Sequence, residues 1–293
     1  MSLNIEMFDK SDQHRMTLDS DDEGDSLCAT NNLSRYILEK DTECFFNVKD
    51  VGSINLLHIN ARSLKKNFVK LESLLANIKN PLSAIAISET WLNDSSTDNF
   101  FLPIYNFISK SRVDKVGGGV GIFVHSSLNY SVRSDLCRME NYIECVFLEI
   151  IQINLKSIII GCIYRPPNAD RETIDIFNSE FSQILKNIEQ GKEKTVLLAG
   201  DYNLDLIKND KHGPIADFLN NLLCHSFLPA IRYPTRISEH SSTLIDNIFI
   251  NVVPERYDSA IIYNDISDHL PIAIHLKVPY FKEGITPQCN SFL

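Results

Sequence analysis

The 293-residue sequence predicts an α/β fold in which two stacked β-sheets carry helices on their outer sides. The expected elements run strand, helix, strand, several strands, helix, strand, helix and strands, without the long strand–helix alternation of one doubly wound sheet. The middle strands have short connections, which favours antiparallel pairs. An apolar content of 44% supplies the core of one large domain.

The positions of the elements follow from the spacing of apolar residues. Three amphipathic helices are expected at residues 64–78, 171–188 and 214–223, and Ser63 suits the N-cap of the first. Buried or half-buried strands are expected at residues 54–59, 82–87, 105–109, 119–124, 132–136, 143–150, 157–163, 195–199, 244–250, 261–262 and 272–276. Residues 33–38 are expected to form a helical turn.

Charge divides the chain into an acidic leader, a folded domain and a tail. Residues 1–50 hold 12 acidic and 5 basic side chains, and roughly the first 30 are too polar to order. We therefore expect a largely disordered leader at residues 1–50, one domain at 51–278 and a loose tail at 279–293. The nearly neutral domain lacks the basic face typical of nucleic-acid binding, although a bound metal ion could supply positive charge at a phosphate.

The cysteine pattern indicates a reducing compartment. The seven cysteines are scattered and include no C-x-x-C pair, so neither a disulfide framework nor a zinc site is predicted. The sequence also contains no secretory signal and no apolar run long enough for a membrane span. We expect an intracellular protein, nuclear or cytoplasmic rather than secreted, that does not bind membranes and is a monomer.

Polar residues able to take part in chemistry follow the apolar strands at the points where these strands end. They are Asn60, Glu89, Tyr164, Asp201 with Asn203, Asp246, and Asp268 with His269. Polar residues are also common in loops that have no function in catalysis or binding. Considered by itself, the Gly200–Asn203 segment has the composition of a turn. Their repetition at strand ends instead predicts one site, because open α/β folds place ligands there.

The residue types in this set suit the hydrolysis of a phosphodiester. Glu89 and Asp268 are hard oxygen ligands of the kind that Mg²⁺ accepts, and Mn²⁺ could replace it. Asp246 within an apolar strand needs a partner, and His269 would gain a raised pKa from it and stabilise negative charge at phosphorus. Asp201 would take a proton from the attacking water, with Asn203 holding its geometry.

Taken together, these motifs resemble the endonuclease/exonuclease/phosphatase superfamily, which is DNase I-like. The resemblance covers about residues 53–277 and follows the family order through Asn60, Ser88-Glu89-Thr90, Tyr164 with Asn168, Gly200-Asp201-Tyr202-Asn203, Ile245-Asp246-Asn247-Ile248-Phe249 and Ser267-Asp268-His269-Leu270-Pro271. It implies a four-layer α/β-sandwich, a divalent metal bound by Glu89, and a water-activating Asp201. It also implies that Asn60 and Asn203 hold the phosphate or orient the nucleophile and that Tyr164 contacts the phosphate. The Asp246–His269 pair and Asp268 would complete the site.

The amino-acid sequences of several motifs are most similar to those of the endonuclease domains of non-LTR retrotransposons. They are His58-Ile59-Asn60-Ala61-Arg62-Ser63-Leu64, the glycines before Val120, Tyr164-Arg165-Pro166-Pro167-Asn168, Pro234-Thr235-Arg236 and Thr243-Leu244-Ile245-Asp246. The resemblance implies DNA nicking that leaves a 3′-hydroxyl for a reverse transcriptase. Arg62 stands where repair endonucleases carry an acidic ligand, which weakens a repair function. No reverse transcriptase follows in the sequence, so such an enzyme or element RNA would act in trans.

Basic and polar side chains near the expected mouth of the site are candidates for phosphate or DNA binding. They are Asn60, Asn168, Arg112, Arg165, Thr235, Arg236 and Ser267. The Gly117–Gly119 run lacks the following Lys-Ser/Thr and helix of a nucleotide loop, and Trp91 is expected to pack near the site.

The sequence thus predicts a Mg²⁺-dependent DNA endonuclease. A phosphatase or lipid phosphodiesterase of the same superfamily and an inactive fragment of a retroelement are the alternatives.

Overall fold

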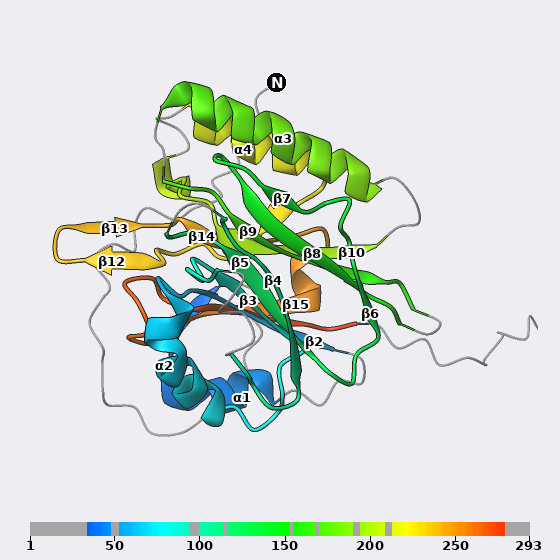
Figure 1. The fold of residues 1–293 in the computed structure, drawn as a ribbon, viewed down its shortest axis with the longest axis vertical. Helices are drawn as coiled ribbons and strands as arrows, with labels where there is room; N and C mark the ends of the chain where they lie inside the picture. Colours follow the sequence, from blue (N-terminus) through cyan, green and yellow to red (C-terminus); the bar gives the residue numbers. More distant parts are fainter. Residues whose placement is uncertain are drawn as a thin grey trace, which may run out of the picture.

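Two seven-stranded β-sheets stack face to face, and helices cover both outer faces (Figure 1). This arrangement comes from a computed structural model that describes residues 34–47, 53–93, 100–113, 116–152, 155–167, 170–189, 194–208 and 213–278. The two sheets and their helices form the four-layer α/β-sandwich expected from the sequence. Most of the acidic leader, like the tail at 279–293, lies outside the described residues.

The first sheet gathers strands from both ends of the described chain. Its order is β1 (Arg35–Leu38), β15 (Tyr257–Tyr263), β16 (Ile272–Leu276), β2 (Ile54–Asn60), β3 (Ala84–Ser88), β5 (Val120–His125) and β4 (Tyr105–Lys110). The pairs β1–β15 and β2–β3 are parallel, and the other described pairs of this sheet are antiparallel. The parallel pair β2–β3 brings the ends of both strands to the same edge.

The second sheet is built from the middle and later parts of the chain. Its order is β11 (Leu228–Pro229), β14 (Asp246–Ile250), β10 (Thr195–Asp201), β9 (Ile158–Tyr164), β8 (Glu144–Ile150) and β6 (Tyr130–Val132), and β7 (Arg138–Met139) also pairs with β8. Only β9–β10 is parallel among the described pairs of this sheet. The sheets are therefore mainly antiparallel, as predicted.

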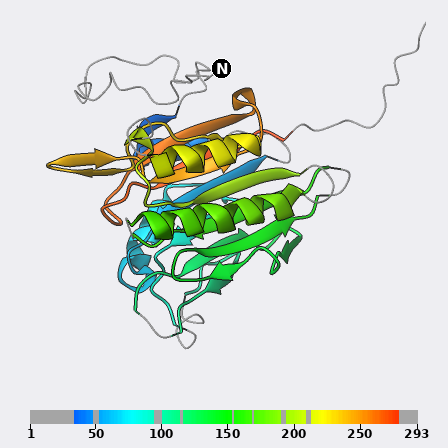
Figure 2. The same cartoon turned by 90° about the horizontal axis from the view of Figure 1, so that it is seen from above.

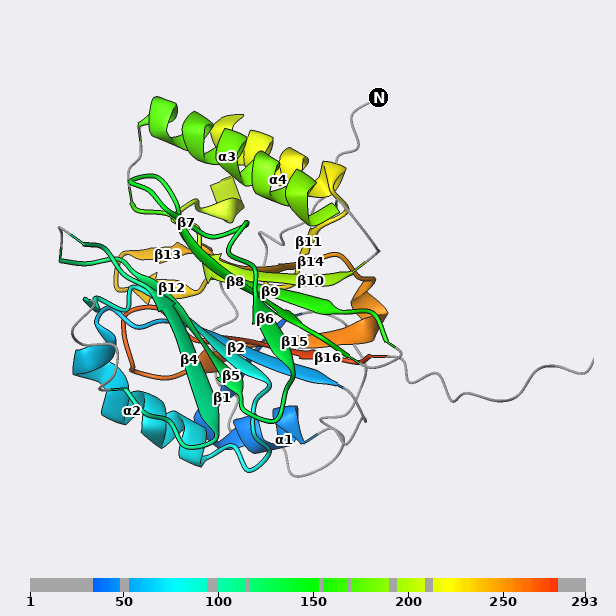
Figure 3. The ribbon, with the colours of Figure 1, turned by 45° about the vertical axis from the view of Figure 1, so that its right-hand side comes forward.

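The helices bury apolar faces against the outer sides of the sheets. In Figure 3, α1 (Thr42–Phe46) and α2 (Leu64–Ala76) lie beside the first sheet, and α3 (Arg171–Glu189) and α4 (Gly213–Cys224) lie beside the second. Ser63 caps α2, since its Oγ accepts a hydrogen bond from the backbone N–H of Lys66 at 3.3 Å. Short 3₁₀ helices are η2 (Glu39–Asp41), η4 (Leu206–Lys208) and η5 (Pro254–Arg256). None of the described helices is long and apolar enough to cross a membrane.

Three local expectations differ from the structure. The helical turn expected at 33–38 is wrong, because Arg35–Leu38 forms strand β1 alongside β15, a partner more than 200 residues away in sequence that local spacing does not reveal. The strand expected at 132–136 is displaced: β6 ends at Val132 and the chain turns after it, with the backbone N–H of Leu136 donating to the Arg133 carbonyl at 3.0 Å. A projecting hairpin of β12 (Arg236–Ser238) and β13 (Ser241–Thr243) was not expected (Figure 2).

Gly200 permits the close pairing of the two strands that carry much of the candidate site. A Cβ atom at this position would lie 2.0 Å from the backbone carbonyl oxygen of Ile163 in β9. Backbone atoms cannot yield as a flexible side chain can. The strand β10 can therefore approach β9 only with glycine at this position.

We expect Gly200→Ala to destabilise the protein by about 1–3 kcal/mol through this overpacking. Urea unfolding monitored by circular dichroism measures the effect. Gly213→Ala is the matched control, because no atom lies within 4 Å of the Cβ position at the start of α4. The control should be neutral or slightly stabilising, and equal stability of the two variants would contradict the proposed constraint on β10.

Candidate active site

The Asn60 side chain connects the two sheets at the edge where β2, β3 and β10 end. Its Nδ2 donates to Glu89 Oε1 at 3.0 Å and to Asp201 Oδ2 at 2.8 Å. Asn60 is 1% exposed and Asp201 is completely buried. One amide thus holds two carboxylates together without neutralising either. The strand-end pattern of the sequence placed these residues in one site but did not predict this bridge.

Asp246 and His269 form a buried pair beside Asp201. His269 Nδ1 lies 2.9 Å from Asp246 Oδ2, and Thr235 Oγ1 donates to the same oxygen at 2.7 Å. Burial lowers the pKa of His269, but the charge of Asp246 outweighs burial and raises that pKa to about 9. Burial likewise raises the pKa of Asp246, yet His269 holds it below its usual value. The ring is therefore positively charged at neutral pH.

Asp201 is poised to exchange a proton near neutral pH. Burial and then the nearby charge of Asp246 raise the pKa of Asp201 to about 7. The Asn203 side chain donates to Asp201 Oδ2 at 3.2 Å and to the carbonyl of Arg165 at 2.8 Å. Asn203 adopts a left-handed φ of 47°, which these contacts and the bond from its own N–H to Asp201 Oδ1 stabilise.

Tyr164 is the last residue of β9 and Arg165 follows it, but their side chains have different surroundings. Tyr164 pairs in register with Asp201 and is 4% exposed, and burial, followed by the charges of Glu89 and Asp201, raises the pKa of its phenol. Its hydroxyl is therefore neutral. Arg165 is 2% exposed, and its guanidinium donates to the carbonyls of Tyr202 and Asn203, both at 2.7 Å. The prediction that Arg165 contacts DNA is wrong, because these bonds hold the Asp201–Asn203 turn from inside.

Asp268 is surrounded by cations at the mouth of the site. Its Oδ2 accepts from Arg62 Nη1 at 2.7 Å and from Arg236 Nε at 2.9 Å. Burial acts to raise the pKa of Asp268, but the arginine bonds hold it at about 2. This pairing differs from the metal-ligand role predicted for Asp268, since its charge is already countered. Arg236 keeps 45% of its side chain exposed and remains accessible to a phosphate.

The remaining predicted phosphate or DNA contacts have mixed positions. Thr235 is completely buried on Asp246, so it positions that carboxylate and does not reach DNA. Ser267 Oγ donates to the Asn60 carbonyl at 2.7 Å and accepts from the His269 N–H at 3.1 Å, which ties the histidine loop to β2. Arg112 forms an ion pair with the buried Glu144 and keeps a quarter of its side chain exposed. Asn168 lies outside the described residues.

The donor set fits a divalent cation at Glu89. Both carboxylate oxygens of Glu89 accept hydrogen bonds from neutral groups, Asn60 Nδ2 and Trp91 Nε1, each at 3.0 Å. Among the described residues Glu89 forms no ion pair, although the Arg62 guanidinium is near enough to interact electrostatically with it. Hard carboxylate oxygens with partial exposure suit Mg²⁺ or Mn²⁺. Asp201, Asp246 and His269 also place ligand atoms within 4.8 Å of one another, although His269 and Asp246 already bond to each other.

Two contributors were missed by sequence reasoning. Trp91, expected to pack, is 41% exposed and donates to Glu89. Glu144 is 1% exposed and accepts from the backbone N–H of Gly119 as well as from Arg112. A carboxylate within an apolar strand was the available signal for Glu144, the same signal that identified Asp246. For Trp91 the only signal was its position two residues after Glu89.

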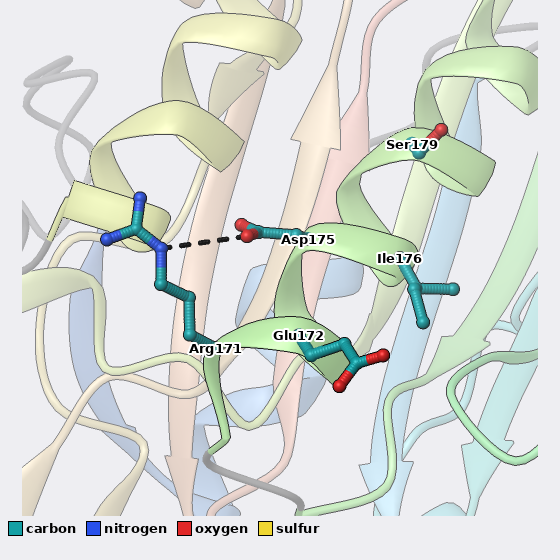
Figure 4. A pocket seen from close by; sticks show the side chains of 5 residues that line it. All are labelled: Arg171, Glu172, Asp175, Ile176 and Ser179. Carbon is teal, nitrogen blue, oxygen red and sulfur yellow. Dashed lines mark ion pairs between the residues drawn. The ribbon is translucent and has the colours of Figure 1, made fainter.

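A surface hollow on α3 shares no lining residue with the candidate active site. It is lined by Arg171, Glu172, Asp175, Ile176 and Ser179 (Figure 4). The charges of Arg171 and Asp175 pair within the helix at 3.6 Å. The hollow contains none of the predicted site residues.

The geometry at the strand ends agrees with the comparison to known families. The model of the Endonuclease/Exonuclease/phosphatase family matches residues 1–269. The chain belongs to this family. Its members are hydrolases that act on phosphodiester bonds and generally use a divalent metal. A search of curated sequences finds no significant match.

Solved structures with the same fold include several proteins that act on DNA. The AP endonuclease LMAP from Leishmania major is 14% identical with a TM-score of 0.63, over 78% of this chain and 88% of that one. The endonuclease domain of TRAS1, a telomere-specific non-LTR retrotransposon, is 14% identical with a TM-score of 0.59, over 77% and 99%. A 3′ phosphatase, NExo from Neisseria, bound to a product DNA hairpin, is 13% identical with a TM-score of 0.55, over 76% and 99%.

The charged His269 predicts a specific dependence of stability on pH. Because its pKa in the folded protein lies above the ordinary value of 6.5, its stabilisation is complete below pH 6.5 and is lost as the pH rises through about 9. We expect the free energy of unfolding to fall by on the order of 2–3 kcal/mol between pH 6.5 and 9.5. Urea unfolding at a series of pH values measures this loss.

His269→Gln is the control, since it keeps a hydrogen-bonding side chain without a titrating ring. Its stability should change much less over the same pH range. A wild-type protein whose stability is as insensitive to pH as that of the variant would show that the ring is not charged by Asp246.

Proposed function

We propose that the protein is a Mg²⁺-dependent DNA endonuclease that nicks one strand by attack of water on phosphorus. The observation that carries the proposal is the junction at Asn60, where one buried amide holds the carboxylates of Glu89 and Asp201 at the end of two sheets. This junction brings a candidate metal ligand and a candidate base together, with a charged His269 close by.

Asp201 is the proposed general base. With its pKa raised to about 7, the carboxylate accepts a proton from water more readily than an ordinary aspartate, and about half of the molecules carry it ionised at neutral pH. The water oxygen forms the new bond to phosphorus, and the bond from phosphorus to the 3′ oxygen breaks. The departing 3′ oxygen takes a proton from solvent water, so the products are a 3′-hydroxyl and a 5′-phosphate. Asn203 and Asn60 orient Asp201 through their amides.

His269 is the proposed stabiliser of negative charge on the phosphoryl oxygens. Its Nδ1 is engaged by Asp246, so Nε2 is the ring nitrogen left to donate to a phosphate oxygen. Thr235 fixes Asp246 and thereby the orientation of the ring. The neutral hydroxyl of Tyr164 is a further donor for the phosphate.

Glu89 is the proposed ligand of the divalent cation, with Mg²⁺ preferred and Mn²⁺ able to replace it. When bound, the cation would supply positive charge near the phosphate and lower the barrier to attack. Asp268 is a weaker candidate because Arg62 and Arg236 already counter its charge.

DNA as the substrate is supported by the neighbouring structures and by the exposed arginines at the mouth. LMAP, TRAS1 and NExo are all named for action on DNA or shown with it. Within this family the retrotransposon-like motifs favour nicking of target DNA, with a reverse transcriptase or element RNA as a partner in trans. A phosphatase or lipid phosphodiesterase would need the same catalytic groups, so the experiment below includes substrates for both.

We expect the purified protein to nick supercoiled plasmid in the presence of Mg²⁺ and not in EDTA. Asp201→Asn should lower the nicking rate by about 10²–10⁴-fold, because the base is lost while the shape of the side chain is kept. Gel separation of supercoiled and open-circular plasmid measures the rate. Lys79→Ala is the control, since Lys79 is exposed and lies before β3, at the opposite end of that strand from Glu89.

Three results would redirect the assignment. Phosphate release from inositol phosphates, or hydrolysis of sphingomyelin, without plasmid nicking would favour the alternative activities. A folded protein inert on every substrate would identify a decayed fragment. Equal nicking by Asp201→Asn would refute the role of this carboxylate.

Arg236 is expected to contact a DNA phosphate through its exposed guanidinium. Arg236→Ala should weaken DNA binding on all sequences and reduce the slope of log affinity against log salt by about 1. Fluorescence anisotropy with a labelled duplex in Ca²⁺ at several salt concentrations measures this slope. Lys79→Ala again serves as the control for loss of one exposed charge, and an unchanged slope in Arg236→Ala would exclude the contact.

A further inference from the structure

The carboxylate of Glu89 is held at both oxygens by neutral donors from different elements. Asn60 Nδ2 donates to Oε1 and Trp91 Nε1 donates to Oε2, each at 3.0 Å. An indole has one N–H and no acceptor, so it can only donate. The pair of donors fixes the plane of the carboxylate without adding a positive charge that would compete with a cation.

The backbone that carries Glu89 and Trp91 is strained and firmly supported. Both residues adopt left-handed conformations, with φ of 51° and 53°. Such conformations persist only where the surrounding structure determines them. On one side the N–H groups of Ser63 and Leu64 donate to the carbonyls of Glu89 and Thr90, both at 2.9 Å.

The glycine run supports the same segment from the other side. The N–H of Thr90 donates to the Gly119 carbonyl at 3.2 Å, and the N–H of Trp91 donates to the Gly118 carbonyl at 2.9 Å. All three glycines have positive φ, and a Cβ at Gly119 would lie 2.4 Å from Thr90 Oγ1. The run that resembled a nucleotide loop therefore forms a support for the Glu89–Trp91 turn.

The position of the indole follows from this support. A Cβ at Gly117 would be in van der Waals contact with Trp91 Nε1, at 3.9 Å, so the ring edge lies against the glycine run. Trp91 is nevertheless 41% exposed. Trp91 therefore does not serve as a core residue. Its large side chain is held in a strained turn, donates to a carboxylate and remains exposed.

We propose that Trp91 is a positioning residue of the metal site: its indole N–H fixes the orientation of Glu89 and thereby strengthens the binding of the divalent cation. This inference rests on the proposed role of Glu89 as the metal ligand. Partners that orient a ligand from outside contribute about 10–100-fold to metal affinity in proteins. Trp91 touches neither water nor phosphate in this scheme and acts through Glu89.

The chain contains a single tryptophan, which makes its fluorescence a direct report on this position. Mn²⁺ is paramagnetic and quenches an indole close to it. We expect Mn²⁺ to quench the emission of the wild-type protein, with a half-saturation that matches Mn²⁺ binding counted by electron paramagnetic resonance. In Glu89→Gln, which keeps Trp91, both quenching and binding should weaken strongly.

Trp91→Phe keeps an aromatic ring and removes only the donor. We expect its affinity for Mn²⁺, measured by electron paramagnetic resonance, to fall by about tenfold or more. If the variant nicks plasmid, the Mg²⁺ concentration for half-maximal rate should rise while the rate at saturating Mg²⁺ stays within about threefold of the wild type, because the lost N–H acts through metal binding. Phe101→Leu is the matched control. Phe101 is an aromatic residue that is 72% exposed, and its substitution removes no hydrogen-bond donor from Glu89.

The outcomes separate this inference from the proposed function. Mn²⁺ binding by Trp91→Phe within twofold of wild type, or Mn²⁺ binding that leaves Trp91 emission unchanged, would overturn the positioning role even if the protein nicks DNA. Weakened binding in a protein that nicks no DNA would support the role and overturn the endonuclease. No Mn²⁺ binding by the wild type would overturn both. If Trp91→Phe does not fold, the quenching experiment still tests the premise, since Mn²⁺ that leaves the emission unchanged, or quenching that persists in Glu89→Gln, would overturn the positioning role.

Discussion

The hydrogen bonds of the Asn60 amide to Glu89 and Asp201 are the constraint on which the site depends. Two buried or half-buried carboxylates close to each other repel and lose hydration, and without a donor between them one would be protonated or turned away. The amide bridges them at 3.0 and 2.8 Å and joins a strand of one sheet to a strand of the other. The stacking of the sheets and the chemistry of the edge are therefore coupled through one uncharged side chain.

The same edge also explains why the site carries so much backbone strain. Among the described non-glycine residues with positive φ, Arg62, Ser63, Glu89, Trp91 and Asn203 all lie in the loops that follow β2, β3 and β10. Each loop must turn sharply so that a polar side chain faces the site while the apolar strand before it stays buried. Cross-loop backbone bonds, such as that of Ser63 N–H to the Glu89 carbonyl at 2.9 Å, keep these turns in place.

The sequence was sufficient for the fold class, the three longer helices and most of the strands, because each has a strong apolar period of its own. It also grouped Asn60, Glu89, Asp201, Asp246 and His269 correctly, since each interrupts or ends such a period. It failed for elements whose stability comes from distant partners. Strand β1 exists through pairing with β15. The short β12–β13 hairpin was missed for a different reason, because its residues are mostly polar and exposed and Ile237 is its one apolar side chain. Arg165 was misjudged because a loop arginine normally faces solvent, whereas here two carbonyls of the Tyr202–Asn203 turn satisfy it inside the protein.

Arg62 stands where the family resemblance implies an acid in repair endonucleases, and an arginine in place of an acid changes the electrostatics of the mouth. Arg62 and Arg236 share one carboxylate, Asp268, so this group carries a net positive charge, whereas an acid at 62 would have made it negative. The exchange places positive charge close to the anionic carboxylates in a domain that is otherwise nearly neutral. Electrostatic attraction of a polyanion then requires no extended basic face, because the charge is concentrated where the strands end. Glu89 and Asp201, by contrast, accept side-chain hydrogen bonds from neutral donors among the described residues: Asn60 and Trp91 for Glu89, and Asn60 and Asn203 for Asp201.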